Sequence, residues 1–268
     1  MRFRIIQLTI FSFLDSDLSH YREKPMKFIN KVIVITGGTS GIGYQMAKIL
    51  QKDNQVIIVA RDKNKLDDLT RKFPAIVTFK ADLSNLKETE TVADAIKNAY
   101  EFIDVLINNA AVQNTPTFLD DDFRYETIAQ EITLNLTSIC SLTYLMLPVL
   151  LKEAKSIIMN INTGLALAPK TSSAIYCGSK GGLAVFSQSL RYQLKDTNIS
   201  VQQAFLDIVD TAMTAGRGKN KMSAENAARN IINGMQREIL DHDLGKVKLL
   251  RSLLRLAPSI AKKIMMKM

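Results

Sequence analysis

Tyr176 and Lys180 are the residues whose types and spacing first suggest chemistry, because they stand four positions apart in a segment that predicts a helix. Side chains with that spacing share one face of a helix. A phenol has a pKa near 10 and is a poor acid–base catalyst at neutral pH, but a neighbouring ammonium group stabilises the phenolate and lowers that pKa. The pair therefore indicates a proton-transfer site, although a tyrosine and a lysine also meet in this way by chance on many helices.

Two more polar residues precede the pair in the chain. Thr163 lies thirteen positions before Tyr176 and directly after a predicted strand. Asn135 lies in the long helix that is predicted before that strand. The chain thus carries an ordered candidate set of an amide, a hydroxyl, a phenol and an amine.

A glycine-rich stretch near the start of the chain could bind a phosphate. The β-branched run at 33–35 predicts a buried parallel strand, which leads through a turn at 36–43 into an amphipathic helix. Gly37 and Gly41 allow backbone angles that a Cβ would forbid, and the helix N-terminus offers N–H groups and partial positive charge to a pyrophosphate. This order of strand, turn and helix is typical of a dinucleotide-binding unit, although glycine-rich turns also occur in other α/β proteins.

Strands and helices alternate along the rest of the chain. Predicted strands cover 55–59, 76–79, 105–107, 156–161 and 200–204, and predicted helices cover 62–73, 86–100, 125–151 and 173–194. Such alternation implies right-handed crossovers and one parallel sheet covered on both faces. The sequence therefore predicts an α/β fold, a Rossmann-type doubly wound parallel sheet in a single three-layer α/β/α domain.

Together these motifs resemble the classical short-chain dehydrogenase/reductase family over residues 31 to about 240. The resemblance rests on T-G-x-x-x-G-x-G at 36–43, on Asn108-Asn109-Ala110, and on the ordered set Asn135, Thr163, Tyr176 and Lys180. The runs Thr163-Gly164-Leu165-Ala166 and Val209-Asp210-Thr211, with a basic C-terminal tail, are similar to a bacterial subgroup often labelled with teichoic-acid D-alanylation operons.

The resemblance implies a role for each member of the set and an NAD(P)-dependent oxidoreductase activity, as a carbonyl reductase or alcohol dehydrogenase. Tyr176 would donate or accept the substrate proton, and Lys180 would lower its pKa and hydrogen-bond the nicotinamide ribose. Thr163 would orient the substrate carbonyl or hydroxyl, and Asn135 would shape its helix and hold a proton-relaying water. The cofactor would carry the hydride.

The cofactor is expected to be NADP(H) rather than NAD(H). An NAD enzyme needs a carboxylate at the end of the second strand to accept the ribose hydroxyls. This chain has Ala60 and Arg61 there, and an arginine can pair with a 2′-phosphate, unless it is merely a solvated loop charge. The residues expected to bind the cofactor are Gly37, Thr39, Ser40, Gly41, Ile42, Arg61, Asp82, Leu83, Asn109, Ala110, Tyr176, Lys180 and Thr211.

Three positions depart from the family's pattern. Thr163 stands where serine is usual, and a threonine is stiffer at χ1. Ala111 adds a methyl group where the backbone packs close to the cofactor. Leu206-Asp207 replaces a Pro-Gly pair beside the nicotinamide, where the carboxylate could disfavour a nearby anion. The last departure keeps a non-catalytic, cofactor-binding regulatory protein open as an alternative.

The two ends of the chain are predicted to lie outside the core domain, which covers residues 28–243. Residues 1–27 are interpreted as an N-terminal extension, either an over-long start or a surface or targeting segment. Residues 244–268 form a basic amphipathic tail that holds much of the net charge of +9. This tail packs on the domain or on a second subunit, or else it contacts an anionic membrane.

Other features narrow the function further. The basic, glycine-containing stretch at 216–221 predicts a mobile lid over the substrate. The two cysteines indicate reduced thiols, and no cluster has metal-ligand spacing, so no metal site is expected. Basic and aromatic residues are not interleaved, so nucleic acid is not an expected partner. The remaining expectations are a small carbonyl or alcohol substrate, a cytoplasmic location and a homo-oligomer, either a dimer or a tetramer.

Overall fold

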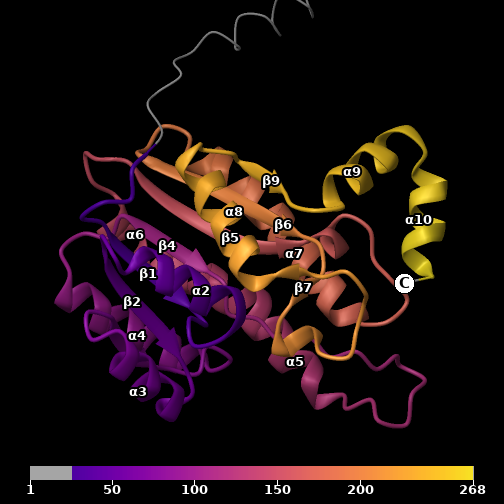
Figure 1. The fold of residues 1–268 in the computed structure, drawn as a ribbon, viewed down its shortest axis with the longest axis horizontal. Helices are drawn as coiled ribbons and strands as arrows, with labels where there is room; N and C mark the ends of the chain where they lie inside the picture. Colours follow the sequence, from indigo (N-terminus) through magenta and orange to yellow (C-terminus); the bar gives the residue numbers. More distant parts are fainter. Residues whose placement is uncertain (1–25, 268) are drawn as a thin grey trace, which may run out of the picture.

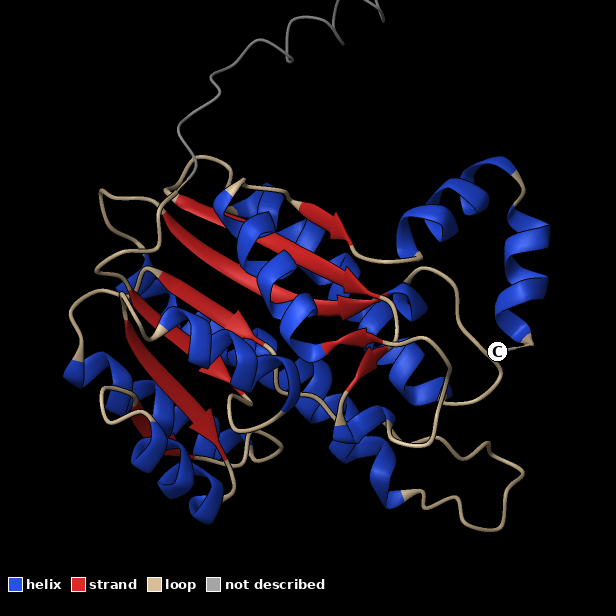
Figure 2. Cartoon of the chain, viewed as in Figure 1, coloured by secondary structure: helices blue, strands red, loops and turns tan. Residues whose placement is uncertain are grey.

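The computed structural model describes residues 26–267, and the interpretation of residues 1–25 lies outside this part of the chain. Seven parallel strands form one sheet in the order β3-β2-β1-β4-β5-β6-β9, and helices cover both of its faces (Figure 1 and Figure 2). Strands β7 and β8 form a separate pair. The predicted Rossmann-type, doubly wound α/β fold is confirmed.

Every strand and helix predicted above is present, with ends within two residues of the prediction. The strands are β1 (Val32–Thr36), β2 (Gln55–Ala60), β3 (Val77–Lys80), β4 (Val105–Asn108), β5 (Ser156–Thr163), β6 (Ile199–Leu206), β7 (Val209–Asp210), β8 (Met222–Ser223) and β9 (Asp241–Asp243). The helices are α2 (Gly41–Leu50), α3 (Lys63–Lys72), α4 (Leu86–Ala99), α5 (Glu126–Ile132), α6 (Ser138–Leu150), α7 (Ala174–Gln193), α8 (Ala224–Gln236), α9 (Val247–Leu256) and α10 (Pro258–Met266).

Alternating side chains on the central strands build a core on each face of the sheet. Ile33 and Ile35 of β1 pack with α2, α3 and α8, whereas Val34 packs on the opposite face with α4, α6 and α7. All three side chains are fully buried. Successive residues of a strand point to opposite faces, so a strand covered on both sides must be apolar throughout.

The direction of strand order reverses between β1 and β4. The chain runs from β1 to β2 and β3 on one side, and then from β4 to β5 and β6 on the other. Ligands of open α/β sheets bind in the crevice at the carboxyl ends of the strands at such a reversal. Gly37 directly follows β1 and Asn109 directly follows β4, so both lie at the mouth of this crevice.

The long helix predicted at 125–151 contains an irregular segment. Residues Thr133–Thr137 form a π-helix between α5 and α6, and Asn135 lies within it. A π-turn widens the helix locally and occurs often at functional sites. Glu126–Leu150 has the length and apolar composition of a membrane-spanning helix, but its Leu142 and Met146 are buried in the core under the sheet.

The C-terminal tail forms two helices, α9 and α10, and Pro258 is the first residue of the second one, where a proline is tolerated. Figure 1 shows α9 and α10 beyond the ends of β5 and β6, on the side to which the strand arrowheads point in Figure 2. The strand β9, which leads into this tail, was not predicted. It consists of Asp241, His242 and Asp243, which carry no apolar pattern, and pairs with β6 through the backbone.

Candidate active site

A cavity of about 1260 Å³ lies at the carboxyl ends of the strands. Pockets for single ligands measure ~300–1,000 Å³, so this one has room for a cofactor and a second molecule. All of the residues expected to bind the cofactor line it: Gly37, Thr39, Ser40, Gly41, Ile42, Arg61, Asp82, Leu83, Asn109, Ala110, Tyr176, Lys180 and Thr211. Thr163 lines it as well.

The turn after β1 depends on its glycines. Gly37 and Gly41 have φ angles of +68° and +54°, which L side chains rarely adopt. A Cβ on Gly37 would lie 2.9 Å from the Cα of Ala110, and one on Gly43 would lie 2.5 Å from the Asn109 amide nitrogen. The absence of side chains lets the turn, the start of α2 and the end of β4 approach each other closely.

Hydrogen bonds fix this close approach. The Thr36 hydroxyl accepts from the backbone N–H groups of Asn109 and Ala110 at 2.9 and 3.0 Å. The Asn109 amide donates to the carbonyls of Thr36 and Gly37 at 2.9 and 3.1 Å. The N–H groups in the first turn of a helix have no partner within it, and Gly41 and Ile42 line the cavity. The hydrogen bonds of Thr36 and Asn109 therefore hold the start of α2 at the cavity, where its free N–H groups can bind an anion.

Positive charge stands at the far end of the cavity. Arg61, which follows β2, and Lys65, in the first turn of α3, both line it. The Asp62 carboxylate caps α3, because it accepts a hydrogen bond from the Lys65 backbone N–H at 3.2 Å. This end of the cavity thus has cationic side chains and a carboxylate that is already hydrogen-bonded.

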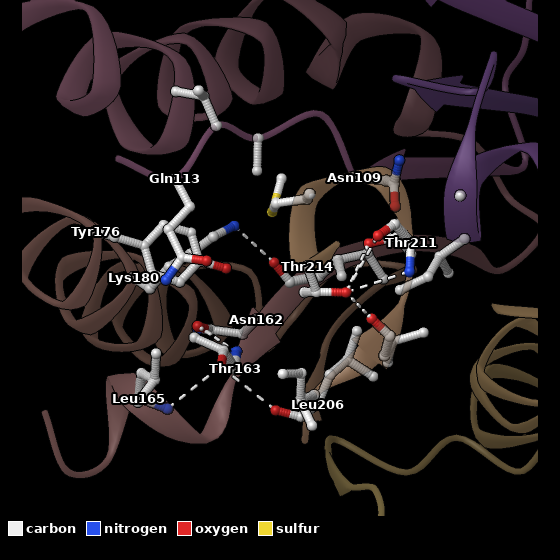
Figure 3. A pocket seen from close by; sticks show the side chains of 18 of the residues that line it. Asn109, Gln113, Asn162, Thr163, Leu165, Tyr176, Lys180, Leu206, Thr211 and Thr214 are labelled. Carbon is white, nitrogen blue, oxygen red and sulfur yellow. Dashed lines mark hydrogen bonds between the residues drawn. The ribbon is translucent and has the colours of Figure 1, made fainter. Parts of the chain in front are cut away.

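Tyr176 and Lys180 lie one turn apart on α7, and both are buried. Figure 3 shows them together on one wall of the cavity, with Thr211 across from them. The Lys180 ammonium group donates to the carbonyl oxygen of Ile161 in β5 at 2.9 Å. This bond fixes the lysine between its helix and the sheet.

Burial dominates the titration of both groups. Burial raises the pKa of Tyr176. The charges of Cys177 and Glu131 raise the same pKa, whereas the charge of Arg217 lowers it. Burial lowers the pKa of Lys180 to about 8. The sequence led us to expect that Lys180 would lower the phenol pKa. In the protein alone, desolvation outweighs such an effect, and Tyr176 is a neutral phenol at neutral pH.

Asn135 lies behind the cavity wall and is the one predicted site residue that does not line it. Its amide accepts from the Val112 N–H and donates to the Val112 carbonyl, both at 2.9 Å. It also donates to the Ser179 hydroxyl at 3.2 Å, and Ser179 donates to the carbonyl of Tyr176 at 2.9 Å. The side chain therefore ties the loop after β4 to the helix that carries Tyr176.

The strand ends of β5 and β6 meet beside Tyr176. The Thr163 hydroxyl donates to the carbonyl of Leu206 at 3.4 Å and accepts from the Leu165 N–H at 3.3 Å (Figure 3). Asp207 also lines the cavity, and its carboxylate accepts from the N–H of Ile208 at 2.8 Å. The unusual loop after β6 is thus held by a local hydrogen bond of its own carboxylate.

The predicted lid, residues 216–221, belongs to a loop after Thr211 that is anchored at both ends. Strands β7 and β8 pair on either side of it, with Val209 opposite Met222. Within it, the Lys221 ammonium group contacts Asp210 at 2.7 Å and donates to the Thr214 carbonyl at 3.1 Å. These bonds bring Thr211 to the cavity opposite the tyrosine (Figure 3).

Two polar side chains, Gln113 and Lys170, are among the cavity residues that sequence reasoning missed. Gln113 follows β4, and Lys170 lies in the loop between β5 and α7. Gln113 accepts from Arg217 of the lid at 3.0 Å and donates to the Ser173 hydroxyl at 3.2 Å. The available signal was their position, since both belong to loops at the carboxyl ends of strands, where ligands bind.

Comparisons with known sequences agree on one family. The family model described as short chain dehydrogenase matches residues 31–222. The uncharacterized oxidoreductase DltE of Bacillus subtilis is 33% identical over 189 residues, which is 70% of this chain and 75% of that protein. The very-long-chain 3-oxoacyl-CoA reductase of Anas platyrhynchos is 32% identical over 190 residues, which is 68% of this chain but only 60% of that protein.

Comparisons with solved structures agree on the fold. A short chain dehydrogenase from Burkholderia cenocepacia in complex with NADP has a TM-score of 0.80 at 20% identity, with coverage of 90% of this chain and 99% of that one. A short-chain dehydrogenase from Sphingobium yanoikuyae in complex with NADPH has a TM-score of 0.76 at 25% identity, with coverage of 86% and 94%.

The tight contact at Gly43 predicts a loss of nucleotide binding in Gly43→Ala. The new methyl group would overlap the Gly37 carbonyl and the Asn109 amide. Because overpacking costs ~1–3 kcal/mol, the dissociation constant of NADPH should rise by about tenfold or more. A fluorescence titration measures this constant, and circular dichroism verifies the fold.

Gly178→Ala is the matched control, since a Cβ there meets nothing within 4 Å. It should bind NADPH like the wild type and gain ~0.5–1 kcal/mol of stability from its helical position. Equal NADPH affinity in the wild type and a folded Gly43→Ala variant would contradict the assigned role of the turn.

Proposed function

This chain belongs to the short-chain dehydrogenase family of oxidoreductases, and we propose that it reduces the carbonyl group of a small molecule with NADPH as its cofactor. One observation carries the proposal. A single cavity has the glycine turn and Arg61 toward one end, and Tyr176 with Lys180 toward the other. Such a cavity can hold a dinucleotide and present a second molecule to a buried phenol.

The residues present fit a pyridine dinucleotide. The glycine turn leaves space where a Cβ would clash, and the start of α2 offers N–H groups to a pyrophosphate. Asp82 and Leu83 line the wall beside the end of β3 and would contact the adenine. When bound, the nicotinamide supplies or accepts the hydride at the carbonyl carbon.

Tyr176 is proposed as the proton donor to the carbonyl oxygen. Because burial raises its pKa, the phenol keeps its proton at neutral pH and can give it to an oxygen on which negative charge develops. Lys180 stands one turn away and is mostly protonated at neutral pH, since its pKa is about 8. Its positive charge stabilises the phenolate that remains after the transfer.

Thr163 and Asn135 are proposed to position the reacting groups. The Thr163 hydroxyl makes a long bond of 3.4 Å to Leu206, which it can exchange for the substrate oxygen. Asn135 acts through Ser179 and Val112, which it joins, rather than by touching the substrate. The predicted water relay at Asn135 remains a proposal.

A preference for NADPH is supported by the charges at the far end of the cavity. Arg61 and Lys65 both line it, and Ala60 occupies the position where an NAD enzyme needs a carboxylate. Asp62, the nearest carboxylate in the chain, caps α3. A 2′-phosphate would add an anion beside both cations, whereas NADH would add none and would leave Lys65 only Asp62, at 3.8 Å, as a carboxylate partner.

A second proposal concerns the tail, which could bind an anionic membrane at its outer surface. Its apolar side chains Leu256, Ile260 and Met266 are more than half exposed. Lysines and arginines supply all of its charged side chains. An exposed surface with both features binds anionic lipid headgroups while its apolar groups enter the interface.

The proton-donor assignment predicts that Tyr176→Phe lowers kcat/KM for carbonyl reduction by ~10²–10⁴-fold, the range for general acid catalysis. NADPH affinity should stay close to that of the wild type. NADPH oxidation on a panel of aldehydes and ketones measures the rate. The control is Tyr192→Phe, which removes an exposed hydroxyl from the same helix.

Equal rates in the wild type and Tyr176→Phe would reject this residue as the acid. A wild type that binds NADPH and reduces no member of a broad panel would instead favour a regulatory, non-catalytic protein.

The cofactor assignment predicts that Arg61→Ala raises the dissociation constant of NADPH by ~10–100-fold, because a hydrogen bond between charged groups contributes ~1.5–3 kcal/mol. The dissociation constant of NADH should not change. Arg71→Ala, which alters an exposed arginine in the last turn of α3, the helix that follows Arg61, is the control. An equal effect on both nucleotides, or none on NADPH, would contradict the preference.

The membrane proposal predicts that the full chain pellets with vesicles of phosphatidylglycerol at low salt and not with neutral vesicles. Replacing Lys262, Lys263 and Lys267 by glutamine should release it, whereas Lys195→Gln, on the surface of the domain, should not. Failure of the wild type to pellet with the anionic vesicles would reject membrane contact.

A further inference from the structure

Two basic side chains line the cavity at the end that faces Tyr176. Lys170 belongs to the loop between β5 and α7, and Arg217 belongs to the lid. Both are half-buried. Neither forms an ion pair with a carboxylate of the described residues 26–267. Two cations therefore share one cavity wall without an internal counter-charge.

The two charges act on each other and on the proposed proton donor. Burial lowers the pKa of Lys170, and the charge of Arg217 lowers it further. The same guanidinium acts in the opposite sense to burial on the pKa of Tyr176. The two positive charges repel each other, and an anion that binds between them would lower this repulsion.

Neutral groups hold Arg217 in this position. Its guanidinium donates to the side-chain oxygen of Gln113 at 3.0 Å and also to the carbonyl of Met213. Gln113 in turn donates to Ser173 at 3.2 Å, a buried residue with a φ of +60° at the start of α7. These partners orient the arginine without cancelling its charge.

An apolar wall stands at the same end of the cavity. It is formed by Leu250 and Leu253 of α9 and by Met265 of α10. The tail that carries it is fastened to the loop of Lys170, because the Thr171 hydroxyl donates to the carbonyl of Met266 at 2.6 Å. Cationic and apolar surfaces thus meet beside Thr171.

We infer that the substrate of this site is an oxo acid with an apolar chain, whose carboxylate is bound by Lys170 and Arg217 while its chain lies against α9 and α10. The inference rests on the proposed reductase activity. An ammonium group and a guanidinium fork match the two oxygens of a carboxylate. The carboxylate is not consumed: a hydride joins the carbonyl carbon, a proton from Tyr176 joins its oxygen, and the product is the hydroxy acid.

The first experiment compares oxo acids with their methyl esters. A set of eight-carbon oxo acids that carry the carbonyl at successive positions is assayed with NADPH beside the matching esters. The wild type should prefer the best acid over its ester by about tenfold or more in kcat/KM, since a charge-assisted hydrogen bond is worth at least that factor. Lys170→Met and Arg217→Met should remove the preference, chiefly through KM for the acid.

Three variants provide controls. Lys170→Arg keeps the charge and should keep the preference for the acid, which a merely structural role of this side chain would not explain. Lys195→Met removes an exposed lysine that does not line the cavity, so kcat, KM and the NADPH dissociation constant should stay unchanged. NADPH dissociation constants are measured for every variant, because a selective loss of NADPH affinity would assign the two cations to the cofactor and overturn the inference.

A second experiment does not depend on turnover. Isothermal titration of the NADPH-saturated protein compares octanoate with octanol. Octanoate should bind to the wild type at least about tenfold more tightly than to either methionine variant, and octanol should bind all three alike. Equal binding of octanoate by wild type and variants, or equal use of acids and esters, overturns the substrate assignment. Tight octanoate binding in a protein that reduces no carbonyl rejects the reductase and leaves the anion site standing.

Discussion

The approach of the first glycine turn to the end of β4 is the contact on which the rest of the site depends. A Cβ on Gly37 would lie 2.9 Å from the Cα of Ala110, so two backbones meet where a side chain would keep them apart. Asn109 bonds to the carbonyls of Thr36 and Gly37 and keeps them there. The strand order reverses between β1 and β4, so this contact lies at the bottom of the cavity. It also places the N-terminus of α2 at the cavity.

The wall that carries Tyr176 and Lys180 has the opposite character, because it keeps polar groups in an apolar setting. Lys180 is among the largest fully buried side chains of the described chain, and its amine has a pKa lowered to about 8. Burying an ammonium group is costly unless it is hydrogen-bonded, and the carbonyl of Ile161 offsets part of this cost. Groups with perturbed pKa values in a cleft are candidates for functional residues. The buried lysine beside the cavity is such a group, which agrees with its proposed role.

The sequence predicts what periodicity and local chemistry determine. The alternation of Ile33, Val34 and Ile35 between two cores follows from strand geometry, and Asp62 caps its helix as its type and position indicate. It does not predict β9, whose polar residues show no apolar pattern and join β6 through backbone pairing and a hydrogen bond from the Gln203 side chain to Asp241. Nor does it predict the raised pKa of Tyr176, because burial is set by what packs around the helix and not by the neighbour one turn away.

The proposed substrate end escapes sequence reasoning because four segments far apart in the chain build it together: the loop after β4, the loop before α7, the lid and the tail. The loop before α7 receives a hydrogen bond chain from the lid, through Arg217, Gln113 and Ser173. The same loop holds α10 through Thr171 and Met266. The C-terminal tail, which the sequence predicts to lie outside the core domain, thus forms one wall of the cavity. The glycine turn carries a recognisable motif, whereas the end beside Tyr176 is built by loops and a tail without one, so a change in lid or tail should alter the proposed substrate specificity more than cofactor binding.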